Sequence, residues 1–236
     1  MEKGASDVAP IFILGTMRSG TTLLERMMSN HSALRGLGEV GLIDRFFRKA
    51  HGDLEPEDFE NLRREYETHA CIEAVRTVDK MPINMRYAGF LHALWPSARL
   101  IHIQRNPNDV ALSIFEAFFD SQAQNFSFTE AGITEYFEEH QRQVAFWNEQ
   151  GIPMKTVRYE DLVRDPAAIL SEVSRYCEID MEIEMLAPER NEAPIQTASL
   201  LQARKPINTA SVNRWTTRAD LLPTLFARWE NDWEAS

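Results

Sequence analysis

The sequence predicts an α/β fold in which a mostly parallel central sheet lies between two layers of helices. Short apolar runs that end in turn residues alternate along the chain with longer segments of helical periodicity. Such alternation is typical of strands joined by helical crossovers, which place the strands in parallel. The 236 residues contain no internal repeat and no low-complexity linker, and we therefore expect a single domain over residues 1–236.

Four segments have the pattern of buried strands. The first is PIFILG at residues 10–15, an apolar run closed by a glycine. The next two are VRTVDKMP at residues 75–82, which we expect to end at Lys80, and ARLIHIQR at residues 98–105. The last is MKTVRYEDL at residues 154–162, which we expect to run into a loop.

The segments between these strands have helical periodicity. Asp165 followed by Pro166 is a strong helix start, because aspartate caps the first N–H groups and proline fits the first helical position. Residues 36–50 are interpreted as a turn and then a helix. The other predicted helices cover residues 19–31, 55–76, 84–95, 109–119, 133–150, 165–179 and 222–233.

The composition restricts the class of protein. Apolar residues make up 44% and charged residues 26%, which is ordinary for a globular protein. The net charge of −11 argues against general nucleic-acid binding, which needs a basic surface. The chain has no apolar run of bilayer length and no secretory signal, and Cys71 and Cys177 are isolated, so we expect a cytoplasmic protein with no membrane contact and no metal.

One stretch departs from this acidic balance. Residues 193–219 hold no acidic residue, yet they carry Arg204, Lys205, Arg214 and Arg218. A basic stretch in an acidic protein favours a site for a small anion, and a solvated loop is the alternative.

The turn after the first predicted strand, GTMRSGTT at residues 15–22, has the glycine spacing of a phosphate-binding loop. A helix N-terminus supplies unpaired N–H groups and a partial positive charge, which suit a phosphate. Thr21 stands where nucleoside triphosphatases have a lysine, and Arg18 lies inside the turn. The loop therefore favours an anion other than a triphosphate, although a plain tight turn is the alternative.

A second cluster follows the strand at residues 98–105. Arg105 ends that strand, and Ser113 comes eight residues later in the next helix. These two side chains are able to hold a second phosphate, and a surface arginine with a helix-face serine is the alternative. Because ligands bind at the carboxyl ends of parallel strands, we expect the loop, Lys80, Arg105 and Tyr159 to lie at one edge of the sheet.

Taken together, these segments resemble the sulfotransferases that use 3′-phosphoadenosine 5′-phosphosulfate (PAPS). PIFILGTMRSGTTLLERMMSNH is similar to their 5′-phosphosulfate loop, and LIHIQRNPNDVALSIF is similar to their 3′-phosphate motif. GLGEVG, VDKMPIN, VRYEDLVRDP and KPINTASVNRW resemble the branch of tyrosylprotein sulfotransferases and bacterial relatives fused to tetratricopeptide repeats. The resemblance runs from about residue 10 to about residue 218 and implies a P-loop-type domain.

The resemblance implies a set of PAPS contacts. The 5′-phosphosulfate would be held by Arg18, Ser19, Gly20, Thr21 and Thr22. Arg105 and Ser113 would hold the 3′-phosphate, and Tyr159 would touch the nucleotide. The acid-free stretch would fold over it, with contacts from Ser199, Lys205 and Arg214. Relatives that modify protein tyrosine carry a further arginine where this chain has Ala117, so cofactor affinity or the acceptor is expected to differ.

The resemblance also implies catalytic roles. Glu39 follows Arg18 by twenty-one residues, the separation of the catalytic glutamate in the tyrosylprotein branch, and is the expected general base. Lys80 would donate to the bridging oxygen, and Arg18 and Ser199 would stabilise transition-state charge. The alternative to these catalytic roles is that Glu39 is a solvated glutamate in a turn and Lys80 a surface lysine before a proline turn. His31 and His102 are rival bases, but His31 fits a helix end and His102 fits strand packing.

The predicted function is in-line transfer of the sulfuryl group from PAPS to a small-molecule or peptide hydroxyl. A small-molecule kinase and a catalytically silent nucleotide-binding module are the alternatives; the absent loop lysine and the absent magnesium aspartate argue against the kinase.

We expect residues 55–76 and 117–130 to line the acceptor pocket. An aromatic slot is one possibility there, with core packing as the alternative for its members Phe115, Phe118, Phe119, Phe126 and Phe128.

Overall fold

The fold is a five-stranded parallel sheet between layers of helices, as the sequence predicted. The computed structural model describes residues 9–50, 53–70, 75–117, 122–191, 193 and 205–229. The strand order is β2-β3-β1-β4-β5, and every neighbouring pair is parallel. The strands are β1 (Ile11–Gly15), β2 (Leu34–Gly38), β3 (Arg76–Lys80), β4 (Arg99–Gln104) and β5 (Met154–Arg158).

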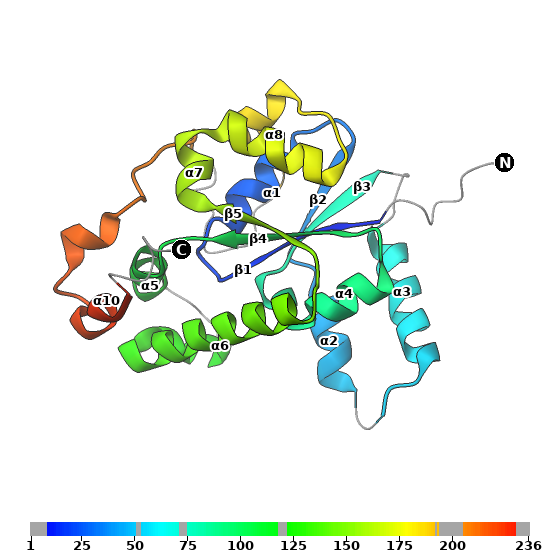
Figure 1. The fold of residues 1–236 in the computed structure, drawn as a ribbon, viewed down its shortest axis with the longest axis horizontal. Coiled ribbons are helices and arrows are strands. Elements are labelled where there is room, and N and C mark those ends of the chain that lie inside the picture. The colour runs from blue at the N-terminus through cyan, green and yellow to red at the C-terminus, as the bar shows by residue number, and fades with distance from the viewer. Residues whose placement is uncertain are drawn as a thin grey trace.

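Helices cover both faces of this sheet (Figure 1). One face carries α1 (Thr21–Ser29), α7 (Tyr159–Arg164) and α8 (Pro166–Cys177). The other carries α2 (Leu42–Lys49), α3 (Pro56–Ala70), α4 (Ala88–Leu94) and α6 (Glu130–Glu149). Beside them lie α5 (Pro107–Phe115) and α10 (Pro223–Trp229). Short 3-10 helices complete the described chain: η3 (Pro82–Tyr87), η4 (Gln122–Phe128), η5 (Ile183–Leu186), η6 (Pro188–Arg190) and η7 (Arg214–Arg218).

The central strand β1 joins two hydrophobic cores. Ile11 and Ile13 pack into the core under α1 and α8, whereas Phe12 and Leu14 pack into the core under α2, α3 and α4. Successive side chains of a strand point to opposite faces, so an uninterrupted apolar run fits a strand covered on both sides. Because β1 is the middle strand, the turn that follows it, between Gly15 and Thr21, lies at the centre of the edge formed by the carboxyl ends of the strands.

The sequence missed the strand β2. We expected a turn from residue 36, but Leu34–Gly38 pairs with β3, with a shift of register between Gly36 and Gly38. Two glycines and an exposed arginine in LRGLG hide the strand, because glycine has low strand propensity. Gly36 is required here, since a Cβ atom at this position would lie 2.3 Å from the Ser29 hydroxyl oxygen of α1.

Other boundaries differ by smaller amounts. The strand expected over residues 154–162 ends at Arg158 and is followed at once by α7, not by a loop. The helix α6 begins at Glu130 because the Thr129 hydroxyl caps its first turn. The predicted helix over residues 84–95 begins as the 3-10 helix η3. Asp165 caps α8 as predicted, since its side chain accepts from the Ala168 N–H at 3.1 Å.

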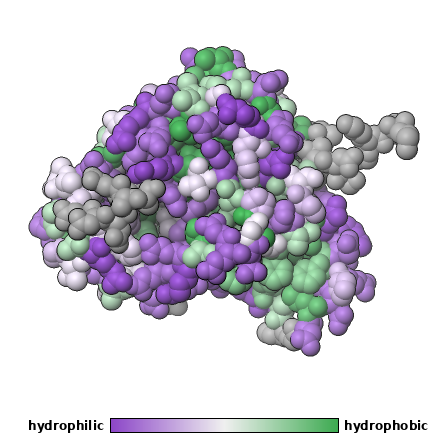
Figure 2. Space-filling view, in the orientation of Figure 1, coloured by the Kyte–Doolittle hydropathy of each residue, from purple (hydrophilic) through white to green (hydrophobic). Residues whose placement is uncertain are grey.

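Aromatic side chains gather over α2, α3 and α4, where hydrophobic surface is visible at the lower right of Figure 2. Phe47 stacks on Tyr87, and its neighbours in the cluster are Phe46, Phe59 and Phe90.

Within the described ranges, none of the helices combines the length and the hydropathy needed to span a bilayer.

Candidate active site

The turn between β1 and α1 has the backbone of an anion-binding loop. Arg18 and Gly20 adopt positive φ angles of 65° and 103°. The Ser19 hydroxyl donates to the carbonyl of Thr16 at 2.7 Å, which braces the turn. A Cβ atom at Gly20 would lie 2.4 Å from the ring of Tyr159, so only glycine fits there. The helix α1 then begins at Thr21, and its first N–H groups lack helical partners.

A cavity of about 590 Å³ lies at this helix start. Its size is typical of a small-molecule site. The side chains around it come from the loop, the start of α7, α5 and the segment from residue 205 to residue 214. The predicted cofactor residues that line it are Arg18, Gly20, Thr21, Thr22, Arg105, Ser113, Tyr159, Lys205 and Arg214. The fold therefore brings together every predicted contact that the structure describes except Ser19, which is buried. Ser199 lies outside the described residues.

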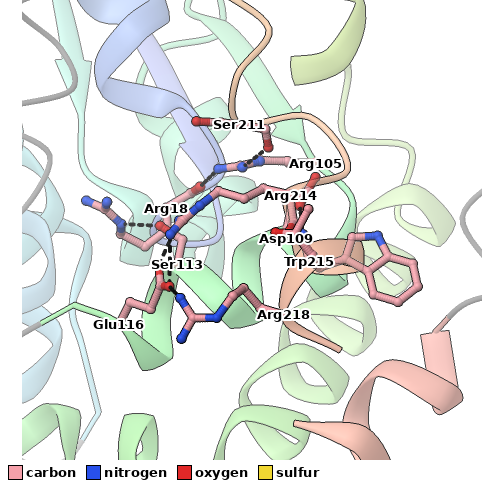
Figure 3. A network of polar contacts seen from close by, with 10 residues as sticks. Arg18, Arg105, Asp109, Ser113, Glu116, Ser211, Arg214, Trp215 and Arg218 are labelled. Carbon is pink, nitrogen blue, oxygen red and sulfur yellow. Dashed lines mark hydrogen bonds and ion pairs between the residues drawn. The ribbon is translucent and has the colours of Figure 1, made fainter. Parts of the chain in front are cut away.

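The two predicted phosphate clusters form one network (Figure 3). The Nε of Arg18 donates to the Ser113 hydroxyl at 2.9 Å. Arg105 donates to the carbonyl of Arg18 at 2.9 Å and to the carbonyl of Ser211 at 2.6 Å. Arg105 also lies over the ring of Tyr159, 4.5 Å from the ring centre. The sequence did not predict that Arg18 would contact the serine of the second cluster.

The cavity has the electrostatics of an anion site. Burial, and next the positive charge of Arg105, lower the pKa of the Arg18 guanidinium. The Nε of Arg105 is buried and has no hydrogen-bond partner among the described residues. An anion bound beside two guanidinium groups that repel one another would stabilise both of them.

Acidic side chains hold the basic segment over the cavity. Asp109 at the start of α5 accepts from the backbone N–H groups of Asn213 and Trp215 at 2.7 and 2.9 Å. Glu116 forms ion pairs with Arg214 at 2.7 Å and with Arg218 at 3.2 Å. Arg214, a predicted cofactor contact, is thus already paired with a carboxylate at the rim.

Glu39 and Lys80 form a second polar centre. The ammonium group of Lys80 donates to the Glu39 carboxylate at 2.5 Å. Lys80 ends β3 as predicted and is buried, whereas Glu39 follows β2 and is partly exposed. Both line a cavity of about 490 Å³, and Thr22 lines this cavity as well as the first one.

This arrangement places a cation-lined cavity beside a carboxylate–ammonium pair at the start of one helix. A family model described as "Sulfotransferase family" matches residues 10–75 and 57–183, which together exceed half of the chain. The chain belongs to the sulfotransferase family.

Solved sulfotransferase structures share the fold. The sulfotransferase domain from the curacin biosynthetic pathway is 19% identical and has a TM-score of 0.69, with 89% of this chain and 90% of that chain covered. The sulfotransferase domain of the Synechococcus PCC 7002 olefin synthase is 22% identical with a TM-score of 0.67, over 88% and 87% of the two chains. Mouse SULT7A1, solved in complex with PAP, is 17% identical with a TM-score of 0.56, over 93% and 84%.

A curated relative from Aquifex aeolicus is described as an uncharacterized protein. It is 28% identical over 90% of this chain. This sulfotransferase chain spans about a third of the length of that relative, since the match covers 31% of it.

The rival histidines lie away from both cavities. His31 contacts the carbonyl of Asp180 at 2.9 Å through its Nε2 atom. His102 on β4 packs against His140 on α6, with their Nε2 atoms 3.1 Å apart. Neither residue lines the cavities of this sulfotransferase, and both fit the structural roles expected from the sequence.

The segments expected to line the acceptor pocket lie mostly away from the two cavities or fall outside the described chain. The helix α3 buries Leu62 and Tyr66 in the core and lines neither cavity. Phe115 and Phe128 are exposed at the surface, and Phe126 stacks on Tyr136. Ala117 lines the cation-rich cavity. Ser199, Phe118 and Phe119 lie outside the described residues.

Sequence reasoning missed the acidic members of this site. Asp109, Glu116 and Glu25 were not singled out from the sequence, although each contacts a segment that carries a predicted site residue. The sequence did contain a clue to Asp109 and Glu116. They lie on either side of the predicted site residue Ser113, and the basic stretch at residues 193–219 has no acidic residue with which to form ion pairs. Within the described ranges, no group of three or more histidine, cysteine or acidic side chains is placed to hold a metal.

Proposed function

We propose that this sulfotransferase moves the sulfuryl group of PAPS to a hydroxyl acceptor, an alcohol, a phenol or a peptide tyrosine, and that residues 1–236 act as one domain. The observation that carries the proposal is the Glu39–Lys80 pair, which opens on a cavity that shares Thr22 with the cation-lined cavity. In this proposal a proton acceptor and an anion site would meet at the start of α1.

The residues of the first cavity fit a ligand with two separate anionic ends. The loop residues Arg18, Ser19, Gly20, Thr21 and Thr22 and the N-terminus of α1 would hold the 5′-phosphosulfate. The other contacts would be Arg105 and Ser113 at the 3′-phosphate, Tyr159 at the nucleotide, and Lys205, Arg214 and Ser199 from the covering segment. The two guanidinium groups of Arg18 and Arg105, which both line this cavity, support this assignment. The PAP complex of mouse SULT7A1, a protein of the same fold, is in keeping with it.

The second cavity would receive the acceptor. PAPS would supply an activated sulfuryl group for transfer to the acceptor oxygen, with the bisphosphate as the leaving group. Glu39 would take the proton of the acceptor hydroxyl on a carboxylate oxygen. Lys80 would donate a hydrogen bond to the leaving oxygen, and Arg18 and Ser199 would stabilise charge on the transferred group. Alignment of these groups with the reacting atoms would contribute to the rate as well.

A thermal-shift experiment separates this proposal from its alternatives. The ligands are 3′,5′-adenosine bisphosphate, ADP and ATP, each with and without magnesium. We expect metal-independent stabilisation by the bisphosphate, of about 2.7 kcal/mol at a hundred times its Kd. Preference for ATP with magnesium would indicate a kinase and overturn the proposal.

A transfer assay with labelled PAPS and a panel of alcohols, phenols and tyrosine peptides tests the chemistry. Sulfate transfer to one acceptor class supports the enzyme and names its substrate. Tight bisphosphate binding without transfer to any member of the panel would favour the silent nucleotide-binding module.

A further inference from the structure

Glu25 connects the anion loop to the turn that carries Glu39. It lies on α1, one turn after Thr21, and it is 8% exposed. Its Oε1 atom accepts a hydrogen bond from the backbone N–H of Gly38 at 2.7 Å. Gly38 has a φ angle of 69° and directly precedes Glu39. A single buried carboxylate therefore ties this turn to the helix whose N-terminus faces the first cavity.

The backbone around Gly38 is shaped to meet this carboxylate. The register of β2 on β3 shifts between Gly36 and Gly38, which is where the Gly38 N–H turns to Glu25. A Cβ atom at Gly36 would lie 3.3 Å from the Oε1 atom of Glu25, closer than most Cβ contacts. At Gly36 the main chain of β2 thus lies directly against the side chains of Ser29 and Glu25 on α1.

A carboxylate at this buried position has a cost. Burial raises the pKa of Glu25 above its ordinary value, although the positive charge of Lys80 acts in the opposite direction. Its neighbours on the helix, Leu24, Met27 and Met28, are fully buried apolar side chains. An apolar residue at position 25 would avoid the desolvation cost but would leave the Gly38 N–H without this acceptor.

We propose that Glu25 is a positioning residue, which fixes Glu39 relative to the start of α1 through its hydrogen bond to Gly38. The inference rests on the proposed function, because it gives Glu39 the role of proton acceptor. Thr22, one turn earlier on the same helix, lines both cavities. One rigid helix therefore sets the distance between the anion site and the base.

The test compares Glu25→Gln with Glu25→Ala, by kcat and KM in the transfer assay. Glutamine keeps a carbonyl oxygen that accepts from Gly38, whereas alanine removes the acceptor. We expect Glu25→Ala to lower kcat about 10- to 100-fold, since displacement of a group by about 1 Å can cost that much. The Kd of the bisphosphate should change less than about threefold, and Glu25→Gln should restore most of kcat. Equal losses in both variants would overturn the positioning role.

Glu182→Ala is the matched control. Glu182 also accepts a backbone N–H, that of Ser32 at 2.7 Å, and so ties the same connection between α1 and β2 away from the cavities. We expect its kcat to equal that of the unmodified protein. A similar loss of kcat in this control would mean that general loosening of the connection, and not the Gly38 contact, explains the effect.

Hydrogen exchange at the Gly38 amide supplies a readout independent of turnover. The amide should exchange faster in Glu25→Ala than in Glu25→Gln. An unmodified protein that transfers no sulfate would overturn the proposed function and the positioning role with it. An active unmodified protein with full kcat in Glu25→Ala would overturn the positioning role alone.

Discussion

Lys80 is 1% exposed at its side chain, whereas its partner Glu39 is 39% exposed. A buried ammonium group is destabilising unless it is paired, and here the Glu39 carboxylate at the cavity wall supplies the ion pair. The pair is therefore asymmetric. Removal of Glu39 leaves a buried cation, while removal of Lys80 leaves a carboxylate that water can still reach.

For this reason we predict that Glu39→Gln and Lys80→Met both retain the fold but lose turnover. The glutamine still accepts a hydrogen bond from Lys80, and the methionine fills the buried volume of the lysine stem. Each variant should lose at least about 100-fold in kcat, equivalent to about 2.7 kcal/mol of transition-state stabilisation. Measured kcat values near that of the unmodified protein would contradict the role of that residue.

Asp79, beside Lys80 on β3, should make stability depend on pH. Burial raises the pKa of this carboxyl from 3.8 to about 8, even though the Tyr66 hydroxyl donates to it at 2.9 Å. The folded state thus keeps a proton that the unfolded state loses near its ordinary pKa. The contribution of this group to stability is complete below about pH 4 and declines as the pH rises to about 8.

Asp79→Asn removes this titration and keeps an acceptor for Tyr66. We expect the unfolding free energy of the variant, minus that of the unmodified protein, to rise between pH 5 and pH 7. The rise should be at most about 1.4 kcal/mol per pH unit and should flatten above pH 8. Urea unfolding at pH 5, 7 and 9 measures it, and a difference that does not change with pH would refute the assignment.

Residues at strand ends were the most predictable part of the site. Lys80, Arg105 and Tyr159 follow apolar runs, and parallel strands bring such positions to one edge. Contacts between side chains were not predictable in the same way. The bond from Arg18 to Ser113 and the tether from Glu25 to Gly38 depend on rotamers and on a register shift that periodicity does not encode.

At the scale of elements, α5 anchors the basic segment that covers the first cavity. The two oxygens of Asp109 accept from two backbone N–H groups at the start of η7. A carboxylate that accepts two N–H bonds has directional contacts that a surface ion pair lacks. The segment is therefore fixed by its backbone as well as by the Glu116 ion pairs.

Asp109→Ala should consequently weaken bisphosphate binding by about tenfold, because the cover loses hydrogen bonds to a charged group. Asp165→Ala is a suitable control, since Asp165 also accepts a backbone N–H at a helix start, but for α8. The control should lose about 1 kcal/mol of stability and no affinity. Calorimetric titration of both variants measures this, and equal affinities would show that the cover does not depend on Asp109.

The elements themselves were predicted unevenly. Long periodic segments such as α6 and α8 were found, and the fold class, a parallel α/β sheet with helices on both faces, was confirmed. The strand β2 was not found, since its formation depends on pairing with β3 and on close contact between Gly36 and α1. Tertiary contacts, rather than local propensity, determine that strand.

At the scale of the whole molecule, His102 and His140 join β4 to the long helix α6. Burial lowers the pKa of His102 to about 3 and that of His140 to about 4. The unfolded chain binds protons at these groups near pH 6.5, so the native state binds fewer protons below that pH. The stability from this pair is present above pH 6.5 and is lost as the pH falls toward 4.

His140→Gln should therefore reduce the acid sensitivity of the fold. Glutamine preserves a polar contact for His102 but does not titrate. We expect the slope of unfolding free energy against pH, between pH 6 and pH 5, to fall by up to about 1.4 kcal/mol per pH unit. Urea unfolding at pH 5, 6 and 7 provides the slopes, and parallel curves for the two proteins would refute the prediction.

The central place of β1 has a consequence for the order of folding during synthesis. Within this chain β1 is made before both of its partners, β3 and β4, which lie at residues 76–80 and 99–104. Its apolar side chains therefore lack their sheet partners until the segment that ends at residue 104 has been made. Contacts this distant along the chain slow folding and leave hydrophobic segments exposed. The strand that precedes the anion loop is thus an apolar segment that stays unpaired, and open to aggregation, while the rest of its sheet is being synthesised.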